Sequence, residues 1–309
     1  MNANDRRYTR RDLFKSAAFA GAAMLAPLPQ ASSLLAQTTR RSAIDQVTLG
    51  KTGIKLSRLG FGCGPMGGQP LATMGVDAFA KLVQYAYDKG ITYFDTAQAY
   101  RTFNMIGQVI KGLPREKIFI QSKIGGQPAD VLAAIDNHRK TYNTDYIDSM
   151  LIHNQQTAGW ATMDTWKRVM DGFEQAKERK WIRAHGVSCH NLPALTSAAD
   201  SDFNEVHLVR INPQGKYTDG PSGGGFSAAE TFPIEPVMAQ VKKMHEKGHG
   251  VIAMKLNGNG TFTTAEDRDK AMRFVVACKD IDAAVIGFTS TQQIDEAIER
   301  MNKALAEVG

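Results

Sequence analysis

Short apolar segments recur roughly every 30 residues along this chain, and longer stretches with a helical pattern separate them. Segments of four to seven residues rich in Val, Ile and Phe are typical of buried strands. We predict eight such strands: Leu59–Gly62, Thr92–Asp95, Ile118–Lys123, Ile147–His153, Arg183–Ser188, Val206–Ile211, Gly250–Lys255 and Ala283–Gly287. Eight strands, each followed by a helix, indicate an α/β protein with a (β/α)8 TIM barrel, a fold that usually takes about 250 residues.

The stretches between the strands place apolar residues three and four positions apart, which predicts amphipathic helices. Examples are Asp77–Lys89, Pro128–Tyr142, Met163–Lys180, Ile234–Lys247 and Ala265–Lys279. Ahead of the first strand, Val47–Leu49 and Ile54–Leu56 flank a turn with a glycine at each end. This pattern predicts an N-terminal β-hairpin in front of the barrel.

A doubly wound nucleotide-binding fold is the competing interpretation of alternating strands and helices. That fold requires a GxGxxG fingerprint directly after its first strand, with an acidic residue about 20 positions further on. Gly60, Gly62 and Gly64 alternate without that spacing. The pattern therefore favours the barrel.

The composition is that of a folded globular chain. Hydrophobic residues make up 43% and charged residues 22% of the 309 positions, which excludes a disordered, collagen-like or coiled-coil chain. The formal net charge is +6, and residues 1–36, with five basic and two acidic residues, carry +3 of it. The remaining charge is too small to indicate a nucleic-acid partner. Three widely spaced cysteines predict neither a disulfide framework nor a metal site.

The first 36 residues have the pattern of an export signal. An arginine-rich start precedes the nearly uncharged run Ala17–Leu28, which is too short to span a bilayer. The segment Thr9–Lys15 resembles a twin-arginine signal. We therefore expect residues 1–36 to be a signal peptide that binds the twin-arginine export machinery and delivers the barrel of residues 46–309 to the periplasm, with no stable membrane insertion after processing. A basic tail that stays disordered or amphipathic is the alternative.

Four reactive side chains fall where predicted strands end. Asp95, Lys123 and His153 close the second, third and fourth strands, and Tyr100 follows Asp95 in the next loop. Intervals of 28 and 30 residues separate the first three, so each interval is one strand–helix unit and we expect all three at one height on adjacent strands. Catalytic groups of such barrels gather at this carboxyl-terminal rim.

These four groups together have a chemical logic. An ammonium beside a phenol lowers the phenol's pKa, and a carboxylate keeps the ammonium charged and in place. Tyr100 could then protonate an oxygen that gains negative charge, with His153 donating to or orienting the same atom. Carbonyl reduction by hydride from a cofactor fits this set.

Each residue alone has an ordinary explanation. Asp95 could cap a helix, Tyr100 could be an amphipathic surface residue, Lys123 could be solvated and His153 could be a core histidine. Because the spacing places the four residues at the ends of neighbouring strands, four separate ordinary explanations would have to coincide, which favours a shared site.

At these residues the chain resembles the aldo-keto reductases, along essentially everything after the signal. The matching blocks are Leu49–Gly53, Leu59–Gly62, Gly90–Tyr100, Thr144–His153 and Ile182–Ser188. The resemblance implies that Tyr100 is the general acid, that Lys123 lowers its pKa, that Asp95 pairs with the lysine and that His153 orients the substrate carbonyl.

The resemblance also implies NADPH or NADH as the cofactor, bound across the carboxyl rim. The residues it points to are Gly62, Ser188, Cys189, Lys255, Gly287, Ser290 and Gln293. Several positions depart from the family's pattern: Cys189 and Ala297 stand where Asn is usual, Leu208 where Gln is usual, Met254 where an aromatic is usual, and Gln293 where many members have a basic residue.

We expect an exported oxidoreductase that reduces an aldehyde or ketone, a small-molecule carbonyl substrate, to an alcohol with NAD(P)H. Because of the departures, the alternative is an exported barrel with a degenerate cofactor site, acting as a binding protein or a weakly active pseudoenzyme.

Overall fold

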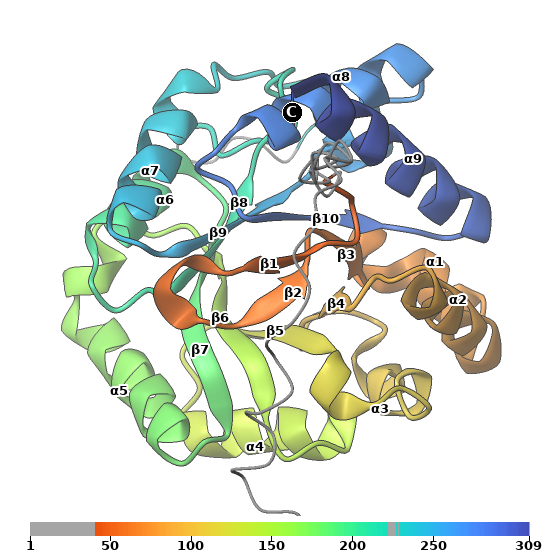
Figure 1. The fold of residues 1–309 in the computed structure, drawn as a ribbon. Helices are drawn as coiled ribbons and strands as arrows, with labels where there is room; N and C mark the ends of the chain where they lie inside the picture. The colour runs from red at the N-terminus through yellow and green to blue at the C-terminus, as the bar shows by residue number, and fades with distance from the viewer. Residues whose placement is uncertain (1–40, 222–226, 228, 309) are drawn as a thin grey trace, which may run out of the picture. The chain divides into compact units, whose positions relative to one another are not determined.

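The computed structural model describes residues 41–221, 227 and 229–308. Residues 1–36, for which we predicted the signal peptide, lie outside this part of the chain. The described residues contain a closed barrel of eight parallel strands with helices around it (Figure 1). The barrel strands are β3 (Leu59–Gly62), β4 (Tyr93–Asp95), β5 (Phe119–Gly125), β6 (Ile147–Gln155), β7 (Ile182–Cys189), β8 (Val206–Arg210), β9 (Gly250–Met254) and β10 (Ala283–Gly287). The predicted (β/α)8 TIM barrel is therefore confirmed.

The helices follow the strands in the predicted alternation. They are α1 (Gln69–Thr73), α2 (Val76–Asp88), α3 (Ile106–Val109), α4 (Val131–Tyr142), α5 (Asp164–Glu178), α6 (Leu192–Asp200), α7 (Glu235–Glu246), α8 (Ala265–Ala277) and α9 (Thr291–Val308). Helix α4 begins three residues later than predicted, because Asp130 is extended and its side chain accepts a hydrogen bond from the Ala133 N–H. Such a residue is an N-cap, so the helix starts after it.

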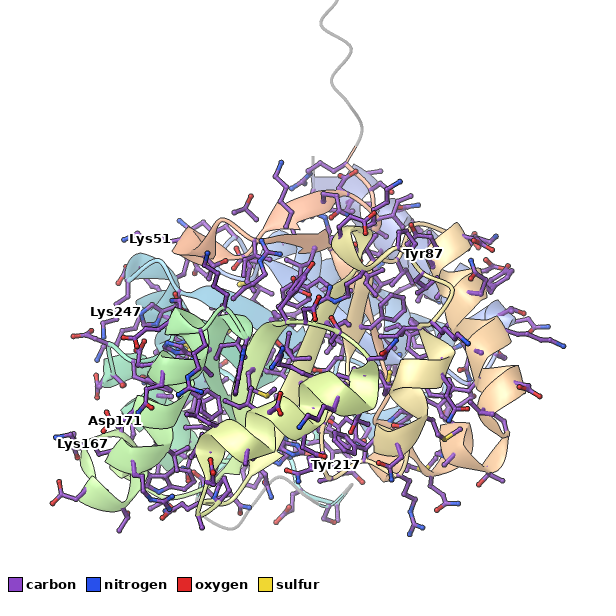
Figure 2. All side chains as sticks on the ribbon, turned by 90° about the horizontal axis from the view of Figure 1, so that it is seen from below. Lys51, Tyr87, Lys167, Asp171, Tyr217 and Lys247 are labelled. Carbon is purple, nitrogen blue, oxygen red and sulfur yellow. The ribbon has the colours of Figure 1, made fainter. Side chains whose placement is uncertain are left out.

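The predicted hairpin is also present and closes one end of the barrel (Figure 1). Strands β1 (Gln46–Thr48) and β2 (Lys55–Ser57) pair antiparallel. The turn between them meets the start of the last two barrel strands: the Lys51 N–H donates to the Gly248 carbonyl and the Gly50 N–H to the Asp282 carboxylate. The hairpin therefore lies at the amino-terminal end of the strands. Figure 2 shows Lys51 and Tyr217, which follows β8, at opposite ends of the molecule.

Two apolar clusters stabilise this arrangement. The inner cluster joins hairpin residues such as Leu49 and Leu56 to barrel-facing side chains such as Tyr93 and Phe119. The outer cluster lies between the strands and the helices. Because successive side chains of a strand point to opposite faces, β4 to β10 contribute to both clusters. Strand β3 contributes Leu59 and Phe61 to the outer cluster alone, because glycines 60 and 62 occupy its other face. Among the described residues, no helix is long and apolar enough to cross a membrane.

The strands are staggered where the reactive residues lie. Asp95 of β4 pairs in register with Gln121 of β5, and Lys123 lies two residues after Gln121. Lys123 in turn pairs with Leu151 of β6, and His153 lies two residues after Leu151. Tilted strands in a closed barrel produce such a stagger. The side chain of Lys123 spans this offset, because its Nζ hydrogen-bonds to the carboxylate of Asp95.

Candidate active site

Lys123 is the centre of the candidate site. Its Nζ donates to both carboxylate oxygens of Asp95 at 2.7 Å, to the Thr96 carbonyl at 2.8 Å and to the Tyr100 hydroxyl at 3.3 Å. The lysine is fully buried and Asp95 is 5% exposed. A buried charge is tolerated when it is paired and hydrogen-bonded, as this one is.

The surroundings of Lys123 keep it charged. Burial alone would lower its pKa, but the carboxylate of Asp95 and the oxygen of Tyr100 outweigh burial, so the pKa is raised. The amine is therefore an ammonium over the whole neutral range. It can both hold the tyrosine in place and stabilise negative charge on the phenol oxygen.

Tyr100 differs from the sequence-based expectation in one respect. Burial raises the pKa of its hydroxyl above the ordinary value, and the lowering effect of Lys123 does not overcome this. The ammonium acts in the predicted direction, but desolvation of the phenolate is the larger effect. The consequence is a phenol that carries its proton at neutral pH, which is the form that a general acid needs.

His153 lies beside the phenol. The two ring centroids are 5.7 Å apart and the rings are nearly perpendicular, at 84°. Burial, together with the positive charges of Lys123 and Lys255, lowers the pKa of the imidazole to about 3. His153 is therefore neutral at physiological pH, with one N–H that can donate to an oxygen.

Two further residues support the four predicted ones. The Gln121 amide donates to Asp95 Oδ1 and to the Tyr93 hydroxyl, each at 2.9 Å. A methyl group on Gly64 would lie 2.3 Å from the ring of Tyr100, so the glycine lets the loop contact the phenol. Sequence reasoning missed both residues. Gln121 could have been found, because a polar residue two before Lys123 must share its face of the strand.

A cavity of about 500 Å³ opens beside this group. It is lined by Asp95 and Tyr100 and extends between the ends of β9 and β10 and helices α8 and α9. Clefts of 300 to 1,000 Å³ are the usual size of small-molecule and cofactor sites. Within the described residues, no group of three or more His, Cys, Asp or Glu is placed to hold a metal ion.

Comparisons with known proteins identify the family of this fold. A sequence model described as the "Aldo/keto reductase family" matches residues 58–308, which include all eight barrel strands. The chain belongs to the aldo/keto reductase family. The match confirms the resemblance seen in the sequence and does not by itself assign a substrate.

Several curated family members are similar to this chain. A "Probable aldo-keto reductase 1" of Glycine max is 32% identical over 215 residues, which are 60% of this chain and 62% of that protein. A "Glycerol 2-dehydrogenase (NADP(+))" of Saccharomyces cerevisiae is 23% identical over 279 residues, 75% of this chain and 89% of that one. The chain thus spans less than two thirds of the length of the Glycine max relative.

Solved structures of family members have the same fold. A putative aldo-keto reductase from Pseudomonas aeruginosa has a TM-score of 0.67 at 20% identity, covering 86% of this chain and 98% of that one. An aldo-keto reductase from Klebsiella pneumoniae, solved in complex with NADPH, has a TM-score of 0.63 at 17% identity, covering 85% and 93%.

The predicted cofactor-binding residues divide into two groups in this family member. Gly62, Lys255, Gly287 and Gln293 line the cavity. In the part of the chain that the structure describes, Ser188, Cys189 and Ser290 are not among the lining residues. The Ser290 hydroxyl instead accepts from the Gln293 N–H at the start of α9.

Ser188 and Cys189 point in opposite directions, as neighbours in a strand must. Cys189 is fully buried in the outer cluster between strands and helices, and this burial raises its thiol pKa. The thiol therefore faces away from the barrel interior, so the side chain of Cys189 is badly placed for the predicted contact. The alternation with Ser188 could have shown this in advance.

A buried polar atom in the lining shows that the cavity fits a polar ligand. The Asn257 Oδ1 has no hydrogen-bond partner among the described residues, and Asn257 lines the cavity. Buried polar atoms without partners are costly, so a ligand that satisfied them would be stabilised there. Lys255 adds a positive charge, and burial, together with the charges of Arg210 and Lys123, lowers its pKa to about 8.

Proposed function

We propose that this protein reduces an aldehyde or ketone to an alcohol with NADPH or NADH, with Tyr100 as the general acid. The observation that carries the proposal is a buried ammonium, Lys123, held between the carboxylate of Asp95 and the hydroxyl of Tyr100 beside a cavity of cofactor size. Membership of the aldo/keto reductase family supports it.

Four side chains of this protein would take part in the reduction of the carbonyl group. Tyr100 donates its proton to the carbonyl oxygen as negative charge develops there. Lys123 stabilises the phenolate that remains, and Asp95 holds the ammonium. The neutral imidazole of His153 donates a hydrogen bond that orients the same oxygen.

Asn257 and Lys255 would hold the nicotinamide cofactor, together with the backbone at Gly62 and Gly287. When bound, the reduced cofactor supplies the hydride that the carbonyl carbon receives. The protein's part is to place the substrate oxygen between Tyr100 and His153 and to exclude water from the phenol.

A comparison of Tyr100→Phe with the unaltered protein tests the proposal. Cofactor oxidation is measured against a panel of aldehydes and ketones, and nucleotide affinity is measured separately by calorimetry. We expect Tyr100→Phe to abolish turnover and to leave nucleotide affinity nearly unchanged. Tyr146→Phe is the matched control, because that tyrosine packs on Arg115 outside the site. Equal turnover of Tyr100→Phe and the unaltered protein would refute the role of Tyr100. If neither NADPH nor NADH bound saturably, the binding-protein alternative would be favoured.

We further propose that residues 1–36 direct export through the twin-arginine machinery to the periplasm. The support is the sequence Thr9–Lys15 and the weakly hydrophobic run after it. The test is cell fractionation of a variant with Arg10→Lys and Arg11→Lys. We expect it to stay in the cytoplasm, whereas the control with Arg6→Lys and Arg7→Lys is exported; equal export of the two would contradict the proposal.

A further inference from the structure

Two arginines line the cavity from the helices that follow β9 and β10, whereas Tyr100 lies in the loop after β4. Arg268 lies in the first turns of α8 and Arg300 lies in α9. Their side chains are 26% and 19% exposed, so both are partly desolvated. They are 32 positions apart in the sequence, and no motif connects them.

The two guanidinium groups share one acceptor. The Nε atoms of both donate to Oε1 of Glu296 at 2.7 Å. Arg268 also donates through Nη1 to the carbonyls of Phe262 and Thr263, at 3.1 and 2.8 Å. These bonds fix the orientation of each planar group before any ligand arrives.

Each guanidinium keeps one nitrogen available. Arg300 uses Nη1 for the Ala265 carbonyl and for Asp269. Neither Arg268 nor Arg300 makes a hydrogen bond through Nη2 to any residue that the structure describes. Two fixed guanidinium groups with spare donors, both lining one cavity, suit a phosphate group, which accepts several charge-assisted hydrogen bonds.

The local charge also favours an anion. Burial alone would raise the pKa of Glu296, but Arg300 and Arg268 outweigh it and lower that pKa, so the carboxylate is ionised and its charge is divided between them. Asp269 pairs with Arg300 and lies 3.6 Å from Lys303. Three cations thus surround two carboxylates.

The position in the cavity decides which phosphate this is. The proposed function places the nicotinamide near Tyr100, because the hydride must reach the carbonyl carbon that Tyr100 serves. A dinucleotide in the same cavity then has its adenosine toward α8 and α9. An additional phosphate at that end is the group that distinguishes NADPH from NADH.

We infer that Arg268 and Arg300 bind the 2′-phosphate of NADPH and make this protein select NADPH over NADH. The inference rests on the proposed function and names the residues that set its cofactor preference. The competing possibility is that Glu296 accepts hydroxyl groups of the adenosine ribose, which would favour NADH. We prefer the phosphate because Oε1 of Glu296 already accepts two charge-assisted bonds, whereas both Nη2 atoms are free to donate to a ligand.

Calorimetric titration without turnover tests the inference. The full chain is titrated with NADPH, NADH, 2′,5′-ADP and 5′-AMP, since the last two differ only in the 2′-phosphate. We expect 2′,5′-ADP to bind at least about tenfold more tightly than 5′-AMP. We expect Arg268→Gln to weaken NADPH binding by about 10- to 100-fold and to change NADH binding by less than about twofold.

Two further variants separate recognition from damage to the fold. Arg273→Gln is the matched control, because Arg273 is also on α8 but pairs with Glu307, and it should leave both affinities unchanged. Arg268→Lys keeps the charge and loses the planar group, so we expect an intermediate loss of affinity for NADPH alone, and unchanged NADH affinity shows that the site remains folded.

The outcomes separate this inference from the proposed function. If NADH binds as tightly as NADPH, or if Arg268→Gln weakens both equally, the inference is wrong and the reductase proposal stands. If neither dinucleotide nor 2′,5′-ADP saturates the protein, both are wrong.

Discussion

Replacement of Asp95 by Asn tests whether the buried ion pair is what keeps Lys123 charged. The change keeps the size of the side chain and removes the carboxylate that accepts two hydrogen bonds of 2.7 Å. Lys123 then has the Thr96 carbonyl and Tyr100 as neighbours, with no counter-charge in hydrogen-bonding contact. Removal of one partner of a buried ion pair typically costs about 3 to 5 kcal/mol of the free energy of unfolding.

The cost depends on pH with a definite sign. In the unaltered protein the folded pKa of Lys123 is raised, so its stabilising effect is complete below the unfolded value of about 10.4 and is lost above the folded one. In Asp95→Asn, burial lowers the folded pKa of the lysine, so the unfolded chain binds more protons. The variant therefore regains stability as the pH rises toward about 10.4, by at most about 1.4 kcal/mol per pH unit.

The assay is denaturant unfolding of both proteins from pH 7 to pH 9.5, with turnover measured in parallel. We expect a deficit of about 3 to 5 kcal/mol at pH 7 that shrinks with rising pH, and a large loss of turnover throughout. Asp136→Asn is the control, because its pair with Arg139 and Lys140 lies on the surface of α4 and is worth less than about 1 kcal/mol. A deficit for Asp95→Asn no larger than the control's, or one that is constant with pH, would refute the reasoning.

Three other changes have expected outcomes. Because Lys255 has a pKa of about 8, dinucleotide affinity should fall above pH 8 by up to about tenfold per pH unit, and calorimetry of Lys255→Met should show no such fall. Gly64→Ala forces a methyl group into the Tyr100 ring, so we expect turnover to drop about 100-fold. A methyl group at Gly125 meets nothing within 4 Å, so Gly125→Ala should leave turnover nearly unchanged in the same kinetic assay. Gln121→Leu removes a hydrogen bond to a charged carboxylate and should lower the free energy of unfolding by about 2 kcal/mol in denaturant titrations; no change would mean that the amide does not hold that carboxylate.

The strands and the candidate site could be predicted because their signals are local or regular. Buried strands appear as apolar runs, and the regular strand–helix repeat places each strand's end at the same rim. That regularity predicts that Asp95, Lys123 and His153 lie at one rim of the barrel. Strand ends were less well predicted: β5 and β6 each continue two residues beyond Lys123 and His153.

What could not be predicted depends on distances between side chains. The pKa of Tyr100 is a balance between burial and the ammonium of Lys123, and the sequence identifies the neighbour but not the extent of burial. Arg268 and Arg300 come from separate helices, and only the packing of α8 on α9 brings them to one carboxylate. The orientation of Cys189, by contrast, could have been predicted, because side chains alternate between the two faces along a strand.

The hairpin that seals the amino-terminal end has a consequence for the order of synthesis. Its turn binds residues just before β9 and β10, and the N–H of Ala43, upstream of the hairpin, donates to the side chain of Asn302 near the end of the chain. The earliest part of the domain to leave the ribosome thus finds its partners among the latest. A nascent chain cannot complete this seal until Asn302 has left the ribosome, so the barrel stays open at this end while helix α9 is being made.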